Sequence, residues 1–139
     1  MQSAAKPNNR ALSARFHVWR SEVRTIIAGS RECTDERDLL DAIEACGWTP
    51  TTVISGAARG ADRLGEAWAA RSGVPCERFP AEWDRHGRAA GFIRNEIMSE
   101  RADALIALWD GSNRGTKHMI DTALRKGLRV YVHKISTSY

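Results

Sequence analysis

The chain has 139 residues and a formal net charge of +4, and its 42% hydrophobic and 27% charged residues are ordinary for one globular domain. No apolar run approaches the roughly 20 residues that cross a bilayer, and the N-terminal segment lacks the apolar stretch of a signal peptide, so we expect a cytoplasmic protein without a membrane partner. Three widely spaced cysteines without a CxxC pair argue against structural zinc or a disulfide framework, and we expect no metal and no cofactor.

Residues 1–20 are predicted to be a flexible, basic N-terminal extension. They mix Ser, Ala, Asn and Pro without a sustained period, and they contain Lys6, Arg10, Arg15 and Arg20 but no acidic residue. Residues 21–139 then hold as many acidic as basic side chains, so this predicted domain is formally neutral. The extension can add salt-sensitive attraction to polyanions, but the domain itself has no net basic excess, which disfavours nucleic acid as its main partner.

After residue 20, short β-branched or apolar runs alternate with segments of helical periodicity. The predicted strands are residues 23–29, 51–55, 76–79, 104–109 and 128–133, and the predicted helices are residues 35–46, 61–71, 88–101 and 117–126. Thr34 is a plausible N-cap of the first helix. Strands that alternate with helices predict an α/β fold, an open parallel sheet with helices on both faces.

Some side chains are predicted to be buried on the inner faces of these helices. They are Leu39, Leu40 and Ile43 on the first helix and Ile93 and Ile97 on the third. Three tryptophans, at positions 48, 68 and 109, are expected in the core or at an interface, and the cysteines are expected to be small apolar fillers.

Three strand exits share a composition that suits phosphate binding. Each combines glycine, a hydroxyl and an arginine just before a helix: residues 29–31, 55–60 and 111–116. Glycine allows close approach of a ligand, the first N–H groups of a helix lack partners, and an arginine fork matches phosphate oxygens. The candidate ligand-binding residues are Gly29, Ser30, Arg31, Ser55, Gly56, Arg59, Gly60, Ser112, Arg114, Gly115 and Thr116.

Each of these loops taken alone is also compatible with an ordinary turn or helix cap. None matches GxGxxG or the P-loop, so the sequence supports neither NAD binding nor ATP hydrolysis. In an open parallel sheet, however, ligands lie beyond the carboxyl ends of the strands. Their joint occurrence therefore favours one shared ligand site.

Three segments together resemble the SLOG superfamily: residues 55–62 (SGAARGAD), Arg94-Asn95, and residues 114–118 (RGTKH). That superfamily includes the cytokinin-activating phosphoribohydrolases and the DNA-processing protein DprA. The resemblance covers about residues 22 to 134 and is nearest to the YspA/YpsA-related branch of bacteria and phages. It implies a modified Rossmann-like fold with strand order 3-2-1-4-5 and the binding of nucleotides or nucleotide-derived ligands.

The resemblance also implies roles for single residues. Gly115 and Thr116 match the Gly-Thr phosphate loop, so their N–H and hydroxyl groups are expected to hold a phosphate. Arg94 corresponds to the arginine of the phosphoribohydrolases' Arg-Lys pair, which faces the ribose phosphate, and Asn95 stands where those enzymes have lysine.

The sequence departs from the phosphoribohydrolases after the Gly-Thr pair. Those enzymes carry a glutamate there that assists departure of the base, whereas this chain has Lys117 and His118, and its first acid is Asp121. Lys117 remains a phosphate-binding candidate. His118 can donate to a phosphate or act as an acid, although a histidine in a first helical turn is as often a capping or surface residue. The departure disfavours N-glycosidic hydrolysis.

Four weaker candidates lie elsewhere in the chain. Asp62 and Glu66, one helical turn apart, can orient a ribose, although a solvated helix face explains Glu66 more simply. His86 and Trp83 belong to the loop before the third helix, and His86 can approach the base. Trp83 can stack on a base or anchor that loop.

Three functions of different classes remain open. The first is a binding or sensing domain for a nucleoside phosphate or an ADP-ribose-like molecule. The second is a hydrolase that releases the base from a nucleoside monophosphate, with Arg94, His118 and either Asp121 or Glu96 as catalytic residues. The third is single-stranded DNA binding, since residues 55–62 resemble the DprA segment. Superfamily members often dimerise, so we expect a homodimer.

Overall fold

A computed structural model describes residues 22–136, so the predicted basic extension lies outside the described residues. The chain forms a five-stranded parallel sheet with the order β3-β2-β1-β4-β5. The strands are β1 (Arg24–Gly29), β2 (Thr52–Ser55), β3 (Cys76–Arg78), β4 (Ala104–Trp109) and β5 (Arg129–Lys134). The predicted α/β fold and its strand order are confirmed.

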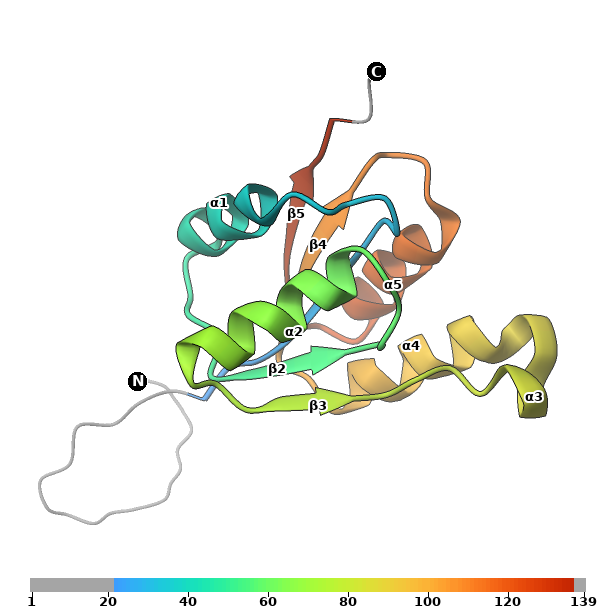
Figure 1. Cartoon of the computed structure of the whole chain (residues 1–139). Helices are drawn as coiled ribbons and strands as arrows, with labels where there is room; N and C mark the ends of the chain where they lie inside the picture. Colours follow the sequence, from blue (N-terminus) through green and yellow to red (C-terminus); the bar gives the residue numbers. More distant parts are fainter. Residues whose placement is uncertain (1–21, 137–139) are drawn as a thin grey trace, which may run out of the picture.

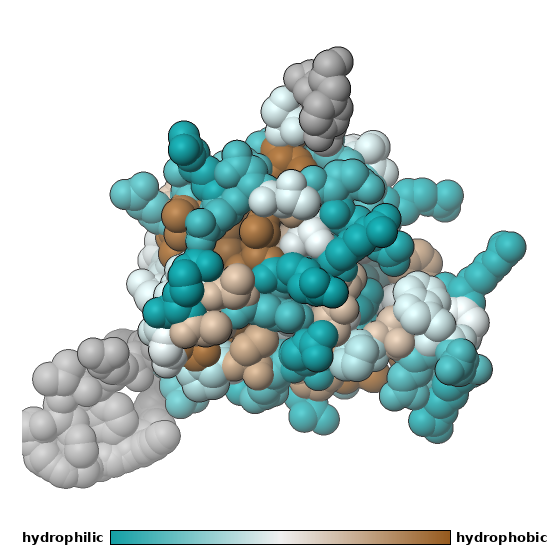
Figure 2. Space-filling model, viewed as in Figure 1, coloured by the Kyte–Doolittle hydropathy of each residue, from teal (hydrophilic) through white to brown (hydrophobic). Residues whose placement is uncertain are grey.

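Helices cover both faces of this sheet (Figure 1). They are α1 (Glu36–Cys46), α2 (Ala61–Ser72), α3 (Trp83–His86), α4 (Ala90–Glu100) and α5 (Arg114–Arg125), with a 3-10 turn (Gly87–Ala89) between α3 and α4. Helices α1 and α2 pack on one face, whereas α5 packs on the other and contacts α4. The molecular face that carries α1 and α2 is mostly hydrophilic, and its hydrophobic atoms lie in small patches (Figure 2).

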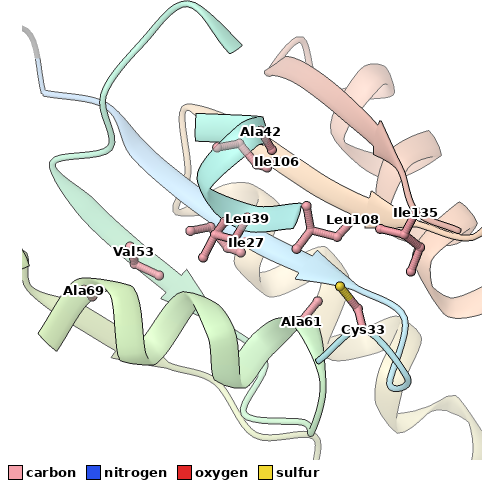
Figure 3. Packing of buried hydrophobic residues seen from close by; sticks show 10 residues of the cluster. All are labelled: Ile27, Cys33, Leu39, Ala42, Val53, Ala61, Ala69, Ile106, Leu108 and Ile135. Atoms are coloured by element: carbon pink, nitrogen blue, oxygen red, sulfur yellow. The ribbon is translucent and has the colours of Figure 1, made fainter. Parts of the chain in front are cut away.

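The core lies on the two sides of the central strands β1 and β4. Successive side chains of a strand point to opposite faces, so Ile27 and Ile106 pack beneath α1 and α2 (Figure 3), while Ile26 and Leu105 pack against α4 and α5. All four are fully buried. Burial on both faces explains why these strands read as continuous apolar runs in the sequence.

The strand order brings the exits of β1 and β4 together. The parallel register pairs Gly29 with Leu108, and the Ser30 N–H donates to the Leu108 carbonyl at 3.0 Å. A β-carbon at Gly29 would overlap that same carbonyl oxygen, so only glycine fits this crossing. The chain order reverses between β1 and β4, and this is the point where open α/β sheets bind ligands.

The helix faces predicted from periodicity are wrong at two positions. Leu40 on α1 is 44% exposed and Ile97 on α4 is 41% exposed, whereas Leu39, Asn95 and Met98 face inward. Both helices carry apolar residues on adjacent faces, so the hydrophobic pattern alone does not show which face is buried.

Some predicted helix ends and buried residues also differ from the structure. Asp35 caps α1 instead of Thr34, because its side chain accepts from the Arg37 N–H at 2.9 Å. Helix α5 begins three residues earlier than predicted because Asn113 is its N-cap. The tryptophans at 48, 68 and 109 pack against the core as expected. Cys33 is buried, whereas Cys76 is exposed on the edge strand β3 and fills no core space.

Within residues 22–136, every helix is too short or too polar to cross a bilayer.

Candidate phosphate-binding pocket

A pocket of about 320 Å³ opens at the carboxyl edge of the sheet. Its walls come from the exits of β1 and β4, the β2–α2 loop, the start of α5, and the segment from α3 through α4. Three arginines line it, Arg31, Arg88 and Arg94, and Asp62 is the one acidic residue among the described residues that do so. The pocket lining therefore carries an excess of positive charge.

Arg94 reaches from α4 across to the β2 exit. Its Nη1 donates to the Gly56 carbonyl, and its Nε donates to the Asn95 side-chain oxygen at 3.1 Å. Burial is the main cause that lowers the pKa of Arg94, with a further contribution from the nearby Arg31, while Asp62 opposes the shift. The guanidinium is thus held in one orientation and is only partly neutralised.

The β2–α2 loop folds around the Asp62 carboxylate. Asp62 Oδ2 accepts from the Ala58 N–H at 3.1 Å, and a β-carbon at Gly56 would lie 2.8 Å from the same oxygen. Ala57, with φ of 62°, is in the left-handed region, a strained conformation for alanine. Burial raises the pKa of Asp62, and the loop N–H groups and Arg94 counteract that rise. One N–H group of this candidate loop therefore already has an anionic partner from the protein.

Ser55 and Glu66 support this loop from outside the pocket. The Ser55 hydroxyl donates to Glu66 at 2.6 Å and accepts from the Ala57 N–H at 3.0 Å. Glu66 also pairs with Arg78 at 3.2 Å. Neither Ser55 nor Glu66 lines the pocket, so their described contacts are structural.

At the start of α5, Asn113 accepts hydrogen bonds from groups that the sequence predicts to bind a phosphate. Its side-chain oxygen accepts from both the N–H and the hydroxyl of Thr116, each at 2.9 Å. The N–H groups of Arg114 and Gly115 donate to no described residue, and Gly115 lines the pocket. First-turn N–H groups lack helical partners and attract anions, so this pair is the available donor set.

The loop before α5 is closed by Asp110. Its carboxylate accepts from the Ser112 and Asn113 N–H groups, each at 2.8 Å, and these bonds are the main reason that its pKa is lowered. The Ser30 hydroxyl is buried and makes no hydrogen bond within the described residues, although its proximity contributes to the lowered pKa of Asp110. Neither Ser112 nor Ser30 lines the pocket: Ser112 is exposed and Ser30 is buried.

A profile of the YspA, cpYpsA-related SLOG family matches residues 23–86. The gene 61 protein of Mycobacterium phage D29 is 34% identical over 116 residues, which cover 77% of this chain and 93% of the phage protein. The chain belongs to the YspA, cpYpsA-related SLOG family. Among solved structures, DNA processing protein A (DprA) from Streptococcus pneumoniae matches with a TM-score of 0.63 at 16% identity, over 80% of this chain. The match covers 50% of the DprA chain and shows a shared fold.

The pocket of this SLOG-family protein contains only part of the predicted site. The predicted residues that line it are Gly29, Arg31, Asp62, Trp83, Arg94, Asn95, Gly115 and Thr116. Gly60 instead lies against the backbone of Ser30 and Arg31, where a β-carbon would overlap both. The predicted residues Arg59, Arg114 and Lys117 have exposed side chains that do not line the pocket.

The acids considered for catalysis lie outside the pocket. Asp121 pairs with Lys117 at 2.7 Å, and Glu96 pairs with Arg125 at 2.6 Å. His118 also lies behind the lining, where its ring stacks on Phe92 with 4.2 Å between centroids.

Sequence reasoning missed Arg88, Phe92 and Asn113, all of which line the SLOG-family pocket. Arg88 and Phe92 precede Asn95 by seven and three residues, a spacing that puts all three on one side of the helix predicted over residues 88–101. That spacing was the available signal, because the Arg94-Asn95 motif already marked this helix as part of a site.

Proposed function

We propose that the pocket binds a small molecule in which a phosphate or diphosphate is attached to a nucleoside. One observation carries the proposal: among the described residues, three guanidinium groups and the free Gly115 N–H at the start of α5 border one pocket, against a single carboxylate. Arginine forks and helix-start amides are the groups that proteins use for phosphate oxygens.

The aromatic residues of the pocket support a nucleoside rather than a bare phosphate. Trp83 and Phe92 line it and are 51% and 48% exposed, so neither ring is buried in the hydrophobic core. An exposed ring beside a cationic pocket suits stacking on a base. Of the two interpretations of Trp83, this exposure favours base stacking over anchoring of the loop.

Asp62 is the group in this pocket that suits a ribose. An ionised carboxylate accepts hydrogen bonds from hydroxyl groups, and two ribose hydroxyls offer adjacent donors. Its position between the β2 exit and Arg94 would then set the ribose between the base and the phosphate.

Calorimetry with ADP-ribose, AMP, inorganic pyrophosphate and adenosine tests the proposal. We expect the phosphate compounds to bind and adenosine to bind more weakly. Arg94→Ala should weaken ADP-ribose binding by about tenfold or more, as expected for lost hydrogen bonds to a charged group. Arg63→Ala is the matched control, because Arg63 is exposed on α2 and does not line the pocket. Absence of binding by every phosphate compound at millimolar concentration, or equal losses in both variants, would contradict the proposal.

A second candidate function is release of the base from a nucleoside monophosphate. The favouring observation is Asp62, a buried carboxyl that lines the pocket; burial raises its pKa, which is the direction that a proton donor to a departing base requires. Water would add across the N-glycosidic bond, with the hydroxyl going to the sugar and a proton to the base. Chromatography of nucleoside monophosphates after incubation tests this: released base that Asp62→Asn abolishes would support hydrolysis, and intact substrate would exclude it.

A further inference from the structure

Asn95 connects Arg94 to the first turn of α5. Its side-chain oxygen accepts from Arg94 Nε at 3.1 Å, and its Nδ2 donates to the Gly115 carbonyl at 3.3 Å. The same Nδ2 lies 3.1 Å from His118 Nδ1. Asn95 is buried, so each of these contacts replaces water. One amide thus links the Arg94 guanidinium, the first turn of α5 and a histidine.

Chemistry fixes which way this amide points. An arginine Nε can only donate, so it must face the Asn95 oxygen, and a carbonyl can only accept, so Gly115 must face the Asn95 nitrogen. His118 Nδ1 then meets an N–H donor and has to be an acceptor. Its proton belongs on Nε2, which lies 3.5 Å from the Thr122 hydroxyl. The network as built requires a neutral His118.

We propose that Asn95 and His118 are positioning residues for Arg94, and that protonation of His118 weakens the binding of a phosphate ligand. The proposal rests on the function proposed above. A protonated ring would turn an Nδ1–H toward the Asn95 amide hydrogens. If Asn95 rotated to relieve this, its nitrogen would face Arg94 and its oxygen would face Gly115, so both of those hydrogen bonds would be lost. Either arrangement loosens Arg94.

The surroundings of His118 agree with a neutral ring. Phe92 stacks on it from α4. The charged groups around it are Glu96 from α4 and Asp121 and Arg125 from α5 itself. Burial is the largest influence and lowers the pKa of His118, Arg125 lowers it further, and the two acids oppose the shift.

The sign of the effect separates this network from simple charge attraction. A histidine that gains a proton near the pocket would, by Coulomb attraction alone, strengthen the binding of an anion. The network requires the opposite, weaker binding in acid. The probe must not titrate in the same range, and a monophosphate does so near pH 6. ADP-ribose, in which both phosphates are esterified, avoids this problem.

The ligand-free protein provides the first test. Nitrogen-15 NMR of the histidine rings should show His118 as the Nε2–H tautomer. Asn95→Asp should raise the pKa of His118, because a carboxylate accepts from a protonated Nδ1. A ring that does not contact residue 95 in solution would keep its pKa. An Nδ1–H tautomer, or an unchanged pKa in Asn95→Asp, would overturn the network.

The second test measures ADP-ribose binding by calorimetry at pH 7.5 and pH 5.5. Wild-type affinity should fall by about three- to tenfold on acidification, the range for one hydrogen bond. His118→Gln and His118→Phe should lose this pH dependence, because neither side chain titrates. His118→Gln should also bind more tightly than His118→Phe at pH 7.5, since its amide oxygen can accept from Asn95.

Affinity that rises in acid, or a fall that both variants retain, would overturn the positioning role. Absence of ADP-ribose binding at either pH would count against the proposed function and against the effect on binding, whereas the NMR result would still decide the tautomer and the network.

Discussion

At the scale of single residues, the pocket depends on how closely Gly56, Asp62 and Arg94 pack. A β-carbon at Gly56 would meet both the Arg94 guanidinium and the Asp62 carboxylate. We expect Gly56→Ala to lower the free energy of unfolding by about 1–3 kcal/mol, as overpacking does, and to weaken ADP-ribose binding because Arg94 is displaced. Gly73→Ala is the control: it forces alanine into a positive φ but meets no atom within 4 Å. Urea denaturation and calorimetry should show that this control loses stability and keeps its affinity. Equal affinity losses in both variants would contradict the assigned packing.

Burial of Asp62 predicts a pH dependence of defined sign. In the unfolded chain its carboxyl titrates near its ordinary pKa, about 3.9, whereas the folded protein holds the proton to higher pH. Between these two pKa values the folded state binds more protons, so this group's contribution to stability falls as pH rises. The unfolding free energy of wild type minus that of Asp62→Asn should therefore fall as pH rises above about 4. Urea denaturation across this range measures it, and a difference that grows with pH would be inconsistent with the buried carboxyl.

At the scale of elements, Asn113 at the start of α5 has two separable roles. Asn113 caps the helix through Thr116 and also lines the pocket. Asn113→Ala should lower the free energy of unfolding by about 1 kcal/mol, the usual cost of a lost N-cap. Asn113→Asp keeps a good cap and should stay near wild-type stability, but its added negative charge should weaken ADP-ribose binding. Thermal denaturation and calorimetry on the pair measure the two effects. Strong phosphate binding by Asn113→Asp would rule out an anion at this turn.

The sequence predicts the strands and helices better than it predicts the side-chain contacts between them. Buried strands on both sides of a sheet have a clear apolar pattern, and the glycines at their ends mark the exits, so the five strands were found. The buried face of α4 was not predicted, because Ile97 and Met98 are adjacent and both apolar, yet only Met98 is buried. The sequence pattern also does not show which loop N–H groups already donate to side chains of the protein. Asp62 and Asn113 satisfy N–H groups that sequence alone leaves free for a ligand, and only side-chain geometry shows this.

At the scale of the whole molecule, the charge distribution bears on nucleic acid. The excess of basic over acidic residues falls entirely within residues 1–20, and the rest of the chain is formally neutral. We expect any gel shift of single-stranded DNA to be lost above about physiological salt and to need Lys6, Arg10, Arg15 and Arg20. A full-length variant with these four changed to Gln tests this. A shift that survives the change at physiological salt would favour DNA binding by the domain itself. The expected homodimer remains a prediction.

We propose that the start of α5 and Arg94 hold one phosphate group together. Backbone and arginine side-chain NMR shifts, followed while ADP-ribose is added to the full chain, measure this contact. We expect the largest changes at the Arg114 and Gly115 amides, at Arg94 Nε and at the Trp83 indole. No change at saturating ADP-ribose, or changes confined to residues away from these groups, would contradict it.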